Sequence, residues 1–470
     1  MTQCTEAVRS LALCVLLASP LRAQEPVPAP EPKNAPPVSV LFIVTDQHHA
    51  SALGAAGNAD IRTPHLDRLA HEGVIFDRAF CNTPQCRPSR YTMWTGEYAR
   101  THGLAPERTT VAELLQEAGY RTASIGKHHM RRERMGRRHG FDETVDMREY
   151  ARNLTELEEE AESTYDAFTR ARKDDVLARA LEDPEPTHPT TFWTDETVRR
   201  LRSVEDQPFF LWVSYYGPHH PYTPSANWLE RYTAEDLQLP TSHASEVDPD
   251  IPVPVRREKH AFTPEHTREV LAHYYAWISQ IDAGIGRLLE TLDELGLAER
   301  TLVVFTSDHG DMAARHRMWT KGQLGYDDTL RVPLILRLPG VLPSGRREAG
   351  LVGLVDLMPT ILELTGVPPA GALPGRSLLP LLRDGSTPWR ETLFAELGEA
   401  SGEHVLVARE ADTKYVAYRS GREVTHEQLF DLRGDPDELV NLAGRPEQSA
   451  TLERLRDALA RWEAETPTAE

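Results

Sequence analysis

The sequence predicts an α/β protein: a large, mostly parallel or mixed β-sheet sandwiched by helices, followed by a smaller C-terminal α+β subdomain. Strong strands are expected where apolar and β-branched residues run almost without interruption, because such strands are covered on both faces. These segments are 38–45, 208–216 and 301–306, with weaker strands at 121–126 and 334–338. Helices are expected where apolar residues recur at helical spacing, at 63–70, 111–118, 268–296 and 354–364.

Four of these strands end directly in residues that bind metals or transfer protons. The residues are Asp46 after the first strand, Lys127 and His129 after 121–126, His219 after 208–216, and Asp308 with His309 after 301–306. A single polar residue at a strand end is more often a cap or a solvated group. In doubly wound α/β sheets, however, sites form beyond the carboxyl ends of the strands. Four convergent cases therefore predict a catalytic domain.

One cysteine, Cys86, lies between two prolines in a stretch with a stiffened backbone. Ser89 is expected to begin a helix, which places the sulfur near a helix N-terminus and near the guanidinium of Arg90. This setting favours a negatively charged group and predicts a reactive thiol. The alternative is a structural cysteine, which in an exported protein would pair with Cys81 in a disulfide.

The composition is that of an ordinary globular protein and argues against general nucleic-acid binding. The 470-residue chain is 40% hydrophobic and 26% charged, and its formal net charge is −20. So acidic a chain has no overall basic face for a phosphate backbone, although a local pocket can still bind a small anion. The length allows one large domain or two unequal ones.

The first 23 residues predict an export signal. Arg9 precedes an apolar run at 11–18, and cleavage is expected after Ala23. The run is too short to form a stable membrane span. The protein is therefore expected to be exported, to the periplasm or out of the cell, with a proline-rich linker at 24–37.

The rest of the chain is expected to form a catalytic domain at 38–385 and a small C-terminal subdomain at 386–465. After residue 386 the pattern changes to short strands and a final amphipathic helix at 448–463. The charge-dense segment 143–207 is expected to form surface helices with a solvated face.

An ordered set of motifs covers nearly the whole of the expected mature chain. It comprises Thr45-Asp46-Gln47, Cys86-Arg87-Pro88-Ser89-Arg90, Gly126-Lys127-His128-His129, Pro218-His219-His220-Pro221, Thr306-Ser307-Asp308-His309-Gly310, Trp319-Thr320-Lys321-Gly322, Arg331-Val332-Pro333-Leu334 and Leu429-Phe430-Asp431-Leu432. The cysteine motif alone would be a weak signal, but the ordered set resembles the formylglycine-dependent sulfatases of the alkaline phosphatase superfamily. The resemblance implies an alkaline phosphatase-like sheet and a hydrolase that cleaves sulfate monoesters.

The resemblance also implies that a formylglycine-generating or equivalent maturation enzyme oxidises Cys86 to formylglycine. The aldehyde hydrates to a geminal diol, and one hydroxyl attacks the sulfur of a small-molecule or glycan sulfate ester and expels the alcohol. The second hydroxyl lets the hemiacetal collapse and release sulfate, so that no water has to attack a hindered sulfate.

A divalent cation is implied as well, held by Asp46, Gln47, Asp308, His309 and the formylglycine at position 86. Oxygen ligands suit calcium best, with magnesium as an alternative. The family often has aspartate in place of Gln47 and asparagine in place of His309, and a histidine ligand leaves manganese or zinc open.

By the same resemblance, the remaining charged residues receive roles. Lys127 and Lys321 would hold the sulfate oxygens, and Arg90 would orient the formylglycine. His219 with Lys321 would protonate the leaving oxygen, and His129 would be the base for collapse of the hemiacetal.

Two other functions stay open. A phosphonate monoester or phosphodiester hydrolase would use the same nucleophile, and the Asp46-Gln47 and Asp308-His309 pairs also resemble such enzymes. The pair of Lys127 and His129 favours the sulfatase, because those relatives generally lack it. A non-catalytic binding homologue is the weaker alternative, since such proteins usually lose the nucleophile or the metal ligands first and this chain keeps both.

Two features lie beside the motifs. His316 would either touch the substrate or brace its own loop, and the bracing role is favoured. The arginine-rich stretch 131–138 would either line the mouth of the site and attract a polyanionic substrate such as a sulfated glycan, or form a solvated loop.

Overall fold

The computed structural model describes most of the chain beyond the expected linker. Described are residues 37–105, 107–129, 139–156, 177–181, 187–204, 206–244, 262–322, 324–383, 388–398 and 403–468. The expected export signal at 1–23 and the arginine-rich stretch 131–138 lie outside these residues. Within the described ranges, no helix is both long and apolar enough to cross a membrane.

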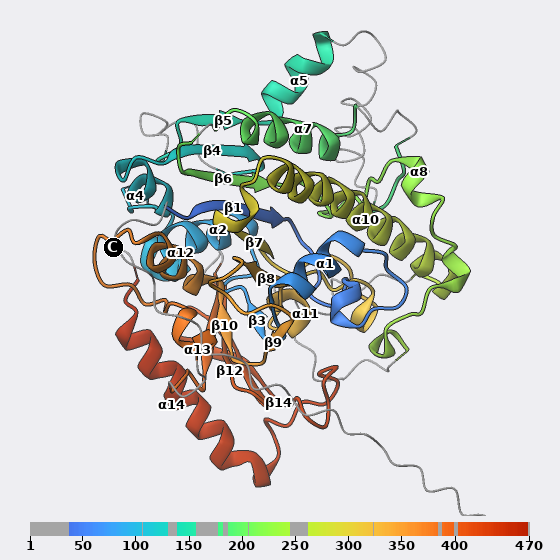
Figure 1. Ribbon diagram of the computed structural model, residues 1–470. Helices are drawn as coiled ribbons and strands as arrows, with labels where there is room; N and C mark the ends of the chain where they lie inside the picture. Colours follow the sequence, from blue (N-terminus) through green and yellow to red (C-terminus); the bar gives the residue numbers. More distant parts are fainter. Residues whose placement is uncertain are drawn as a thin grey trace, which may run out of the picture.

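A mixed sheet of eight strands forms the centre of the molecule (Figure 1). Its order is β5 (Glu143–Val145), β4 (Arg121–Gly126), β6 (Phe209–Ser214), β1 (Ser39–Thr45), β7 (Thr301–Ser307), β8 (Leu334–Arg337), β2 (Val74–Phe76) and β9 (Arg346–Glu348). Neighbouring strands are parallel except at β8, which runs antiparallel to both β7 and β2. The predicted mostly parallel or mixed sheet is confirmed.

The four strands that precede the predicted functional residues lie side by side. β1 pairs with β6 and β7, and β6 pairs with β4, all in parallel. The register aligns Thr45 with Ser307 at the ends of β1 and β7. Asp46 and Asp308, which follow them, therefore leave the sheet at the same edge, and Lys127 follows β4 at that edge as well.

Helices cover both faces of the sheet (Figure 1). One layer consists of α1 (Pro64–Glu72), α7 (Pro189–Leu201) and α10 (Pro264–Glu294). The other consists of α2 (Cys86–Thr95), α4 (Val111–Glu117) and α12 (Leu357–Thr365). Successive side chains of β1 alternate between the layers: Leu41 and Ile43 pack with the first, and Phe42 and Val44 with the second. Shorter helices are α3 (Ala99–His102), α5 (Met147–Glu156), α8 (Ala226–Leu229) and α13 (Leu379–Arg383).

The helix that carries Cys86 begins earlier than the sequence predicts. α2 starts at Cys86 itself, and Gln85 precedes it as an extended N-cap without a side-chain cap. Ser89, expected to begin the helix, lies inside the first turn, where its Oγ donates a 2.5 Å hydrogen bond to the carbonyl oxygen of Asp308. The hydroxyl thus ties α2 to the loop after β7, a use that depends on a distant part of the chain.

Of the charge-dense segment 143–207, the structure describes 143–156, 177–181, 187–204 and 206–207, and the charged runs at 158–160 and 170–175 lie outside these residues. Strand β5 joins the edge of the sheet, and α7 packs along α10 with Trp193 fully buried. Only one side of α7, with Asp195 and Arg199, is exposed. α7 therefore has the expected solvated face on one side, while its apolar side covers the sheet. α10 itself begins at Pro264, before its predicted start.

The C-terminal part forms a four-stranded antiparallel sheet with one long helix. The strands are β11 (Leu393–Gly398), β12 (Glu403–Arg409), β13 (Thr413–Ser420) and β14 (Glu423–Asp431), and the helix is α14 (Ser449–Glu465). Leu406 and Tyr415 pack with α14, whereas Val407 and Val416 on the opposite face join the core of the α2 and α12 layer. The expected short strands and final helix are present; the boundary at residue 386 stays a prediction.

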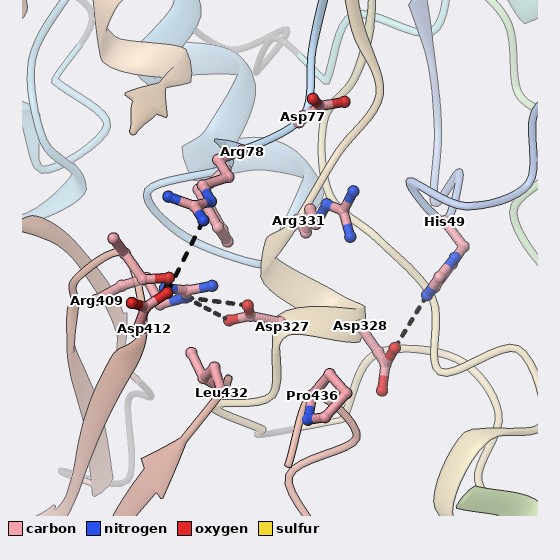
Figure 2. Close-up of a pocket in the computed structure, with 12 residues that line it drawn as sticks. His49, Asp77, Arg78, Asp327, Asp328, Arg331, Arg409, Asp412, Leu432 and Pro436 are labelled. Atoms are coloured by element: carbon pink, nitrogen blue, oxygen red, sulfur yellow. Dashed lines mark hydrogen bonds and ion pairs between the residues drawn. The ribbon is translucent and has the colours of Figure 1, made fainter. Parts of the chain in front are cut away.

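A buried ionic cluster joins this sheet to α11 (Asp327–Leu330). Lys414 contacts Glu438 and also Asp327, at 3.1 Å between Nζ and Oδ1. Arg409 reaches the same carboxylate, at 3.0 Å between Nε and Oδ2 (Figure 2). Because separating paired buried charges is costly, the cluster holds α11 in place against the C-terminal sheet.

Candidate active site

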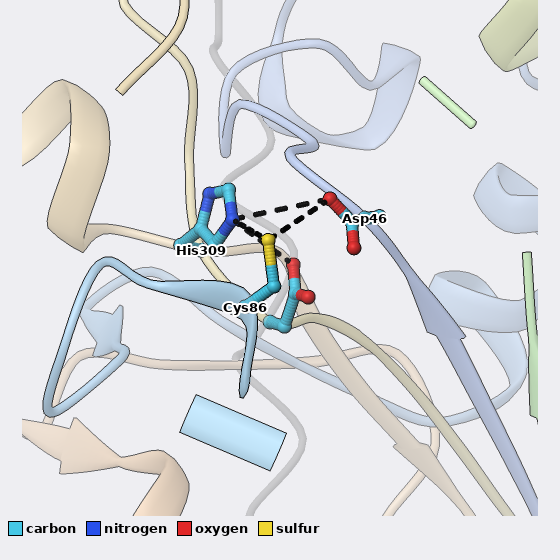
Figure 3. Close-up of side chains that lie close together, drawn as sticks. Asp46, Cys86 and His309 are labelled. Carbon is cyan, nitrogen blue, oxygen red and sulfur yellow. Dashed lines mark hydrogen bonds and ion pairs between the residues drawn. The ribbon is translucent and has the colours of Figure 1, made fainter. Parts of the chain in front are cut away.

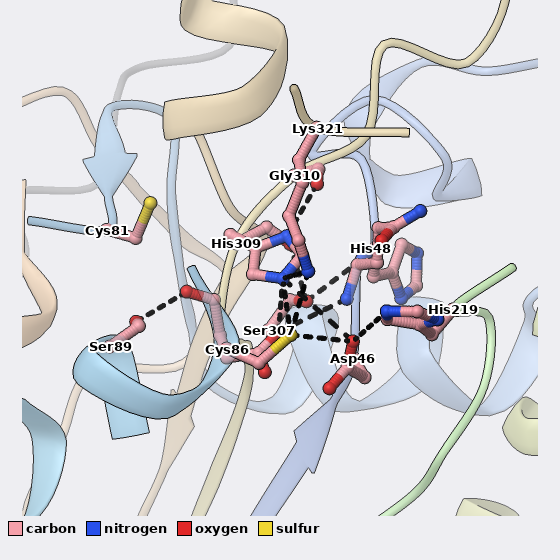
Figure 4. A network of polar contacts seen from close by, with 12 residues as sticks. Asp46, His48, Cys81, Cys86, Ser89, His219, Ser307, His309, Gly310 and Lys321 are labelled. Carbon is pink, nitrogen blue, oxygen red and sulfur yellow. Dashed lines mark hydrogen bonds and ion pairs between the residues drawn. The ribbon is translucent and has the colours of Figure 1, made fainter. Parts of the chain in front are cut away.

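Cys86 lies in a buried polar cluster beyond the carboxyl edge of the sheet (Figures 3 and 4). Its Sγ is 3.2 Å from His309 Nε2, 3.7 Å from Asp46 Oδ1 and 2.8 Å from Lys321 Nζ. Only 8% of the residue is exposed. Residues from β1, α2 and the loops after β7 thus meet at one sulfur atom, as the strand-end pattern predicts.

The second cysteine, Cys81, stays outside this cluster. Both thiols are free, so the alternative of a disulfide between them is wrong. Burial, together with the charge of Asp308, raises the pKa of Cys81 well above its ordinary value, and its Sγ lies 3.6 Å from the carbonyl oxygen of Thr329. A buried, protonated thiol is unreactive, which leaves Cys86 as the candidate reactive position.

Two fully buried carboxylates share one arginine beneath Cys86. Arg90 contacts Asp46 at 3.0 Å and Asp308 at 2.8 Å, both from Nη2, and its Nη1 donates to the carbonyl oxygen of Lys127 and to Ser214 Oγ. The guanidinium is itself fully buried. It therefore acts as the fixed counter-charge of the carboxylate pair and orients both side chains toward the thiol.

Burial and neighbouring charges shift the pKa values of these two carboxylates in opposite directions. Burial favours neutral Asp46, but Lys127, His219 and Arg90 outweigh it and hold the pKa of Asp46 well below its ordinary value. Burial and the charge of Asp46 raise the pKa of Asp308 to about 6. Two carboxylates so close repel each other, and a further cation between them would relieve that repulsion.

The donor atoms around Cys86 fit a metal ion. One ligand atom each from Asp46, Cys86, Asp308 and His309 lies within 4.8 Å of the others. The Nδ1 of His309 is 2.8 Å from the Gly310 carbonyl oxygen, so that Nδ1–H can donate there and leave the Nε2 lone pair facing Cys86. Burial and Lys321 lower the pKa of His309 to about 4, which keeps the ring neutral as a ligand must be.

Gln47 lies beside this donor set with its amide oxygen unused. Its backbone nitrogen donates to Asp308 Oδ1 at 3.2 Å, and its Nε2 donates to Asp311 Oδ2 at 2.6 Å. The buried Oε1 has no hydrogen-bond partner among the described residues. An orphaned oxygen next to two carboxylates is a further hard donor, which fits calcium, magnesium or manganese.

Lysines flank the thiol on two sides. Lys127 Nζ is 2.6 Å from Asp46 Oδ2 and 4.0 Å from Cys86 Sγ. Burial disfavours charged Lys321, but Cys86, Asp46 and Asp308 outweigh burial and raise the pKa of Lys321. Both ammonium groups are thus placed to bind an anion that reaches Cys86.

The two predicted proton-transfer histidines are neutral in this environment. Burial and Lys127 lower the pKa of His129 to about 2, and its buried Nδ1 has no hydrogen-bond partner among the described residues. Burial and Lys127 also lower the pKa of His219 well below its ordinary value, and its Nε2 lies 3.9 Å from Asp46 Oδ1. His316 stacks on Tyr326, with ring centroids 4.4 Å apart, which agrees with the expected bracing of its loop.

Asp311 is a buried carboxylate near the site that sequence analysis does not identify. It connects the loops that carry the site residues. Asp311 accepts hydrogen bonds from Gln47 Nε2 (2.6 Å), Tyr222 Oη (2.7 Å), Ala313 N (2.7 Å) and Thr320 N (3.0 Å). These donors come from the loops after β1, β6 and β7, and Thr320 adjoins Lys321. The only available signal was its position directly after Asp308-His309-Gly310.

Comparison with known proteins identifies the family. Residues 39–367, most of the chain, match the family model described as Sulfatase. The chain belongs to the sulfatase family. Residues 314–465 of the sulfatase also match the model described as N-sulphoglucosamine sulphohydrolase, C-terminal. The protein is a sulfuric ester hydrolase with an alkaline phosphatase-like fold, as the motifs imply.

Named relatives are similar over most of their length. The sulfatase is 30% identical over 458 residues to an arylsulfatase of Clostridium perfringens (strain 13 / Type A), covering 90% of this chain and 93% of the relative. It is 28% identical over 457 residues to arylsulfatase K of Homo sapiens, covering 88% of this chain and 81% of the relative.

Solved structures share the fold. The phosphonate monoester hydrolase SpPMH from Silicibacter pomeroyi matches with a TM-score of 0.76 and 27% identity, over 92% of this chain and 96% of that one. A protein solved in complex with its substrate D-glucosamine-2-N,6-O-disulfate matches with a TM-score of 0.75, over 91% and 98%. At 21% identity, the second match shows a common fold alone.

Asp311→Asn is expected to lower kcat for sulfate ester hydrolysis by about 10²-fold, because small displacements of catalytic groups cost about that much. Asparagine keeps one acceptor oxygen, so its amide nitrogen faces either the donors on Oδ2, Gln47 Nε2 and Tyr222 Oη, or those on Oδ1, Ala313 N and Thr320 N, and frees that pair. Asp356→Asn is the control away from the site: Asp356 is fully buried, accepts from Gly353 N and Arg376 N, and pairs with Arg390. Thermal unfolding should show that both variants lose stability, and steady-state kinetics that only the first loses kcat. Equal kcat values would contradict a positioning role.

Proposed function

We propose that this sulfatase hydrolyses a sulfate monoester to an alcohol and inorganic sulfate, using a formylglycine made from Cys86 and one divalent cation. The observation that carries the proposal is the position of Cys86 Sγ, buried between two carboxylates and two lysines. An ordinary thiolate nucleophile does not need buried acids around it, because they oppose its negative charge. Oxygen atoms at that position would instead complete a hard cation site, as formylglycine does.

Asp46, Gln47, Asp308 and His309 would hold the cation, with calcium favoured by the oxygen donors and magnesium or manganese as alternatives. Bound there, the cation supplies Lewis-acid polarisation of a sulfate oxygen and makes the hydroxyl groups at position 86 more acidic. Arg90 keeps both carboxylates oriented through its contacts with Asp46 and Asp308. The protein thus provides the fixed frame into which cation and substrate fit.

The lysines would bind the sulfate, and the histidines would transfer protons. Lys127 and Lys321, on either side of Cys86, hold the sulfate oxygens and absorb the charge that develops in the transition state. His219 with Lys321 protonates the leaving oxygen, because a bound sulfate opposes the effect of Lys127 and raises the pKa of His219. Burial and Lys127 lower the pKa of His129 to about 2, too low for an effective base, so its role in the collapse of the hemiacetal requires a bound sulfate that offsets Lys127 and raises this pKa.

The substrate class, export, maturation and domain bounds are proposed as well. A small-molecule or glycan sulfate ester is the substrate class, supported by the similarity to relatives named arylsulfatase over most of the chain. Residues 1–23 would export the chain to the periplasm or out of the cell, and a maturation enzyme would convert Cys86. The catalytic domain would span residues 38–385, and the C-terminal subdomain 386–465.

Phosphonate monoester hydrolysis is the competing function, favoured by the 27% identity to SpPMH and by the Asp46-Gln47 and Asp308-His309 pairs. Parallel assays on an aryl sulfate and an aryl phosphonate monoester separate the two. We expect a higher kcat/KM on the sulfate, because phosphonate hydrolase relatives generally lack the pair of Lys127 and His129.

Chelation of divalent cations should abolish turnover, and calcium, magnesium or manganese should restore it. A clear preference for the phosphonate, or unchanged turnover after chelation, would refute the proposal.

A further inference from the structure

A second pocket lies outside the cluster around Cys86, between the main domain and the C-terminal sheet (Figure 2). It has a volume of about 310 Å³, which is the lower end of the range for small-ligand sites. Its walls come from the turn after β2, with Asp77 and Arg78, from α11 and Arg331, and from the C-terminal segments around Arg409 and Asp412. None of the residues around Cys86 lines it.

Each carboxylate in the wall of this pocket already has a cation of its own. Asp77 pairs with Arg347, Asp327 with Arg409 and Lys414, Asp328 with Arg315, and Asp412 with Arg433. Asp328 also contacts His49 at 3.0 Å. Each acid is therefore paired with a cation other than Arg331, although the charges of Asp77, Asp327 and Asp328 also act on Arg331, and the acids do not make the pocket a cation site.

Arg331 is different from these arginines. Among the described residues, its guanidinium forms no hydrogen bond and no ion pair, although the residue is partly buried and lines the pocket. Burial lowers the pKa of Arg331 from its ordinary value, and the charges of Asp327 and Asp77 offset this effect only in part. In Figure 2 no dashed line leaves Arg331, whereas Arg78 nearby reaches Asp412 only at 3.9 Å. Five N–H donors of one guanidinium thus lie unused at the wall of a cavity.

We propose that this pocket binds an anionic group, a sulfate or a carboxylate, with Arg331 as its main contact and Arg78 as the second. A planar guanidinium binds such oxyanions through two parallel hydrogen bonds, and these charge-assisted bonds are strong where water is partly excluded. Two sources share this chemistry: free inorganic sulfate, and a sulfate or carboxylate substituent on a glycan. The site is independent of the reaction assigned to Cys86.

One element links the pocket to the reaction centre. The carboxylates of Asp327 and Asp328 on α11 line the pocket, while the carbonyl oxygen of Thr329 in the same turn accepts from Gly310 N at 2.8 Å. Gly310 directly follows His309. The short helix that lines the pocket therefore also bonds to the peptide that follows His309.

The test is a titration of the full-length protein with sodium sulfate, followed by calorimetry. The reaction centre also binds sulfate, so three proteins are compared: wild type, Arg331→Gln and Lys321→Gln. We expect wild type to show a binding step that Lys321→Gln retains and that Arg331→Gln weakens by about 10–100-fold, the value of charge-assisted hydrogen bonds. Arg331→Lys, which keeps the charge but not the fork, should be intermediate. Identical isotherms for wild type and Arg331→Gln would overturn the proposal for free sulfate.

A second arm uses an oligosaccharide that carries sulfate and carboxylate groups. Binding that depends on Arg331 for the oligosaccharide but not for sodium sulfate assigns the anion to a glycan substituent, and the absence of any Arg331-dependent binding in both arms refutes the site. The melting temperature in anion-free buffer provides the folding control. Since Arg331 has no partner among the described residues, Arg331→Gln should melt at the same temperature as wild type or higher. A lower melting temperature would mean that the guanidinium stabilises the fold, which also contradicts the proposal.

Discussion

Cys86→Ala is expected to abolish sulfate ester turnover, with a fall in kcat of about 10⁴-fold or more, as for the loss of other enzymatic nucleophiles. Alanine removes both the attacking group and the donor atom at position 86 in the Asp46, Asp308 and His309 cluster. The fold should persist, because Cys86 Sγ contributes contacts only inside this cluster. Steady-state kinetics on an aryl sulfate, together with circular dichroism of both proteins, checks the expectation.

Cys81→Ala is the matched control, because Cys81 is a second buried free thiol that packs in the hydrophobic core outside the cluster around Cys86, with its Sγ 3.6 Å from the carbonyl oxygen of Thr329. It should keep kcat within about tenfold of wild type, the cost of a small packing defect. Mass spectrometry of the peptide around position 86 then separates the chemistries, since formylglycine and cysteine differ in mass. An active protein whose position 86 is entirely thiol would exclude formylglycine as the nucleophile.

Arg90→Met is expected to destabilise the metal-free protein by about 3–5 kcal/mol, the usual cost of removing one partner from a buried ion pair. Arg90 is completely buried and is shared by Asp46 and Asp308, so its loss leaves two buried carboxylates that repel each other. Lys127 then remains as the cation in contact with Asp46. Turnover should fall as well, because the orientation of both carboxylates depends on the guanidinium. Chemical denaturation in the presence of a chelator measures the loss of stability.

Arg68→Met is the control for a charge removed at the surface. Arg68 pairs with Glu72 and Asp293, but its side chain is 42% exposed. Such exposed pairs contribute about 0–1 kcal/mol, so this variant should unfold close to wild type. If the two variants lost similar amounts of stability, the buried carboxylate pair would not be the cause.

The sheet and the reaction centre were predictable because both follow local patterns. Apolar runs identify β1, β6 and β7, and the polar residues after them meet because parallel strands end at a common edge. The same rule predicts that Asp46 and Asp308 lie close together. Strong local signals that share a geometric consequence are the part of this fold that one sequence reveals.

Features that depend on distant partners were missed. Ser89 looks like a helix cap, but its hydroxyl is used by Asp308, and the helix begins at Cys86. In the sequence of α7, the many charged residues make the apolar side that covers the sheet hard to recognise. The roles of Asp311 and Arg331 depend on their neighbours in the fold. Four donors bond to the carboxylate of Asp311, whereas no described residue bonds to the guanidinium of Arg331. Local sequence carries no record of such surroundings.

The burial of Cys86 has a consequence for how active protein is produced. The residues that enclose the thiol, His309 and Lys321, emerge from the ribosome long after Cys86 itself. Under the proposed chemistry, the thiol must therefore be converted while the nascent chain is still open, because the folded protein leaves only 8% of the residue exposed. Conversion and folding compete in time. Molecules that fold first keep the thiol and remain inactive despite an intact fold, so the active fraction of a preparation records the outcome of that competition.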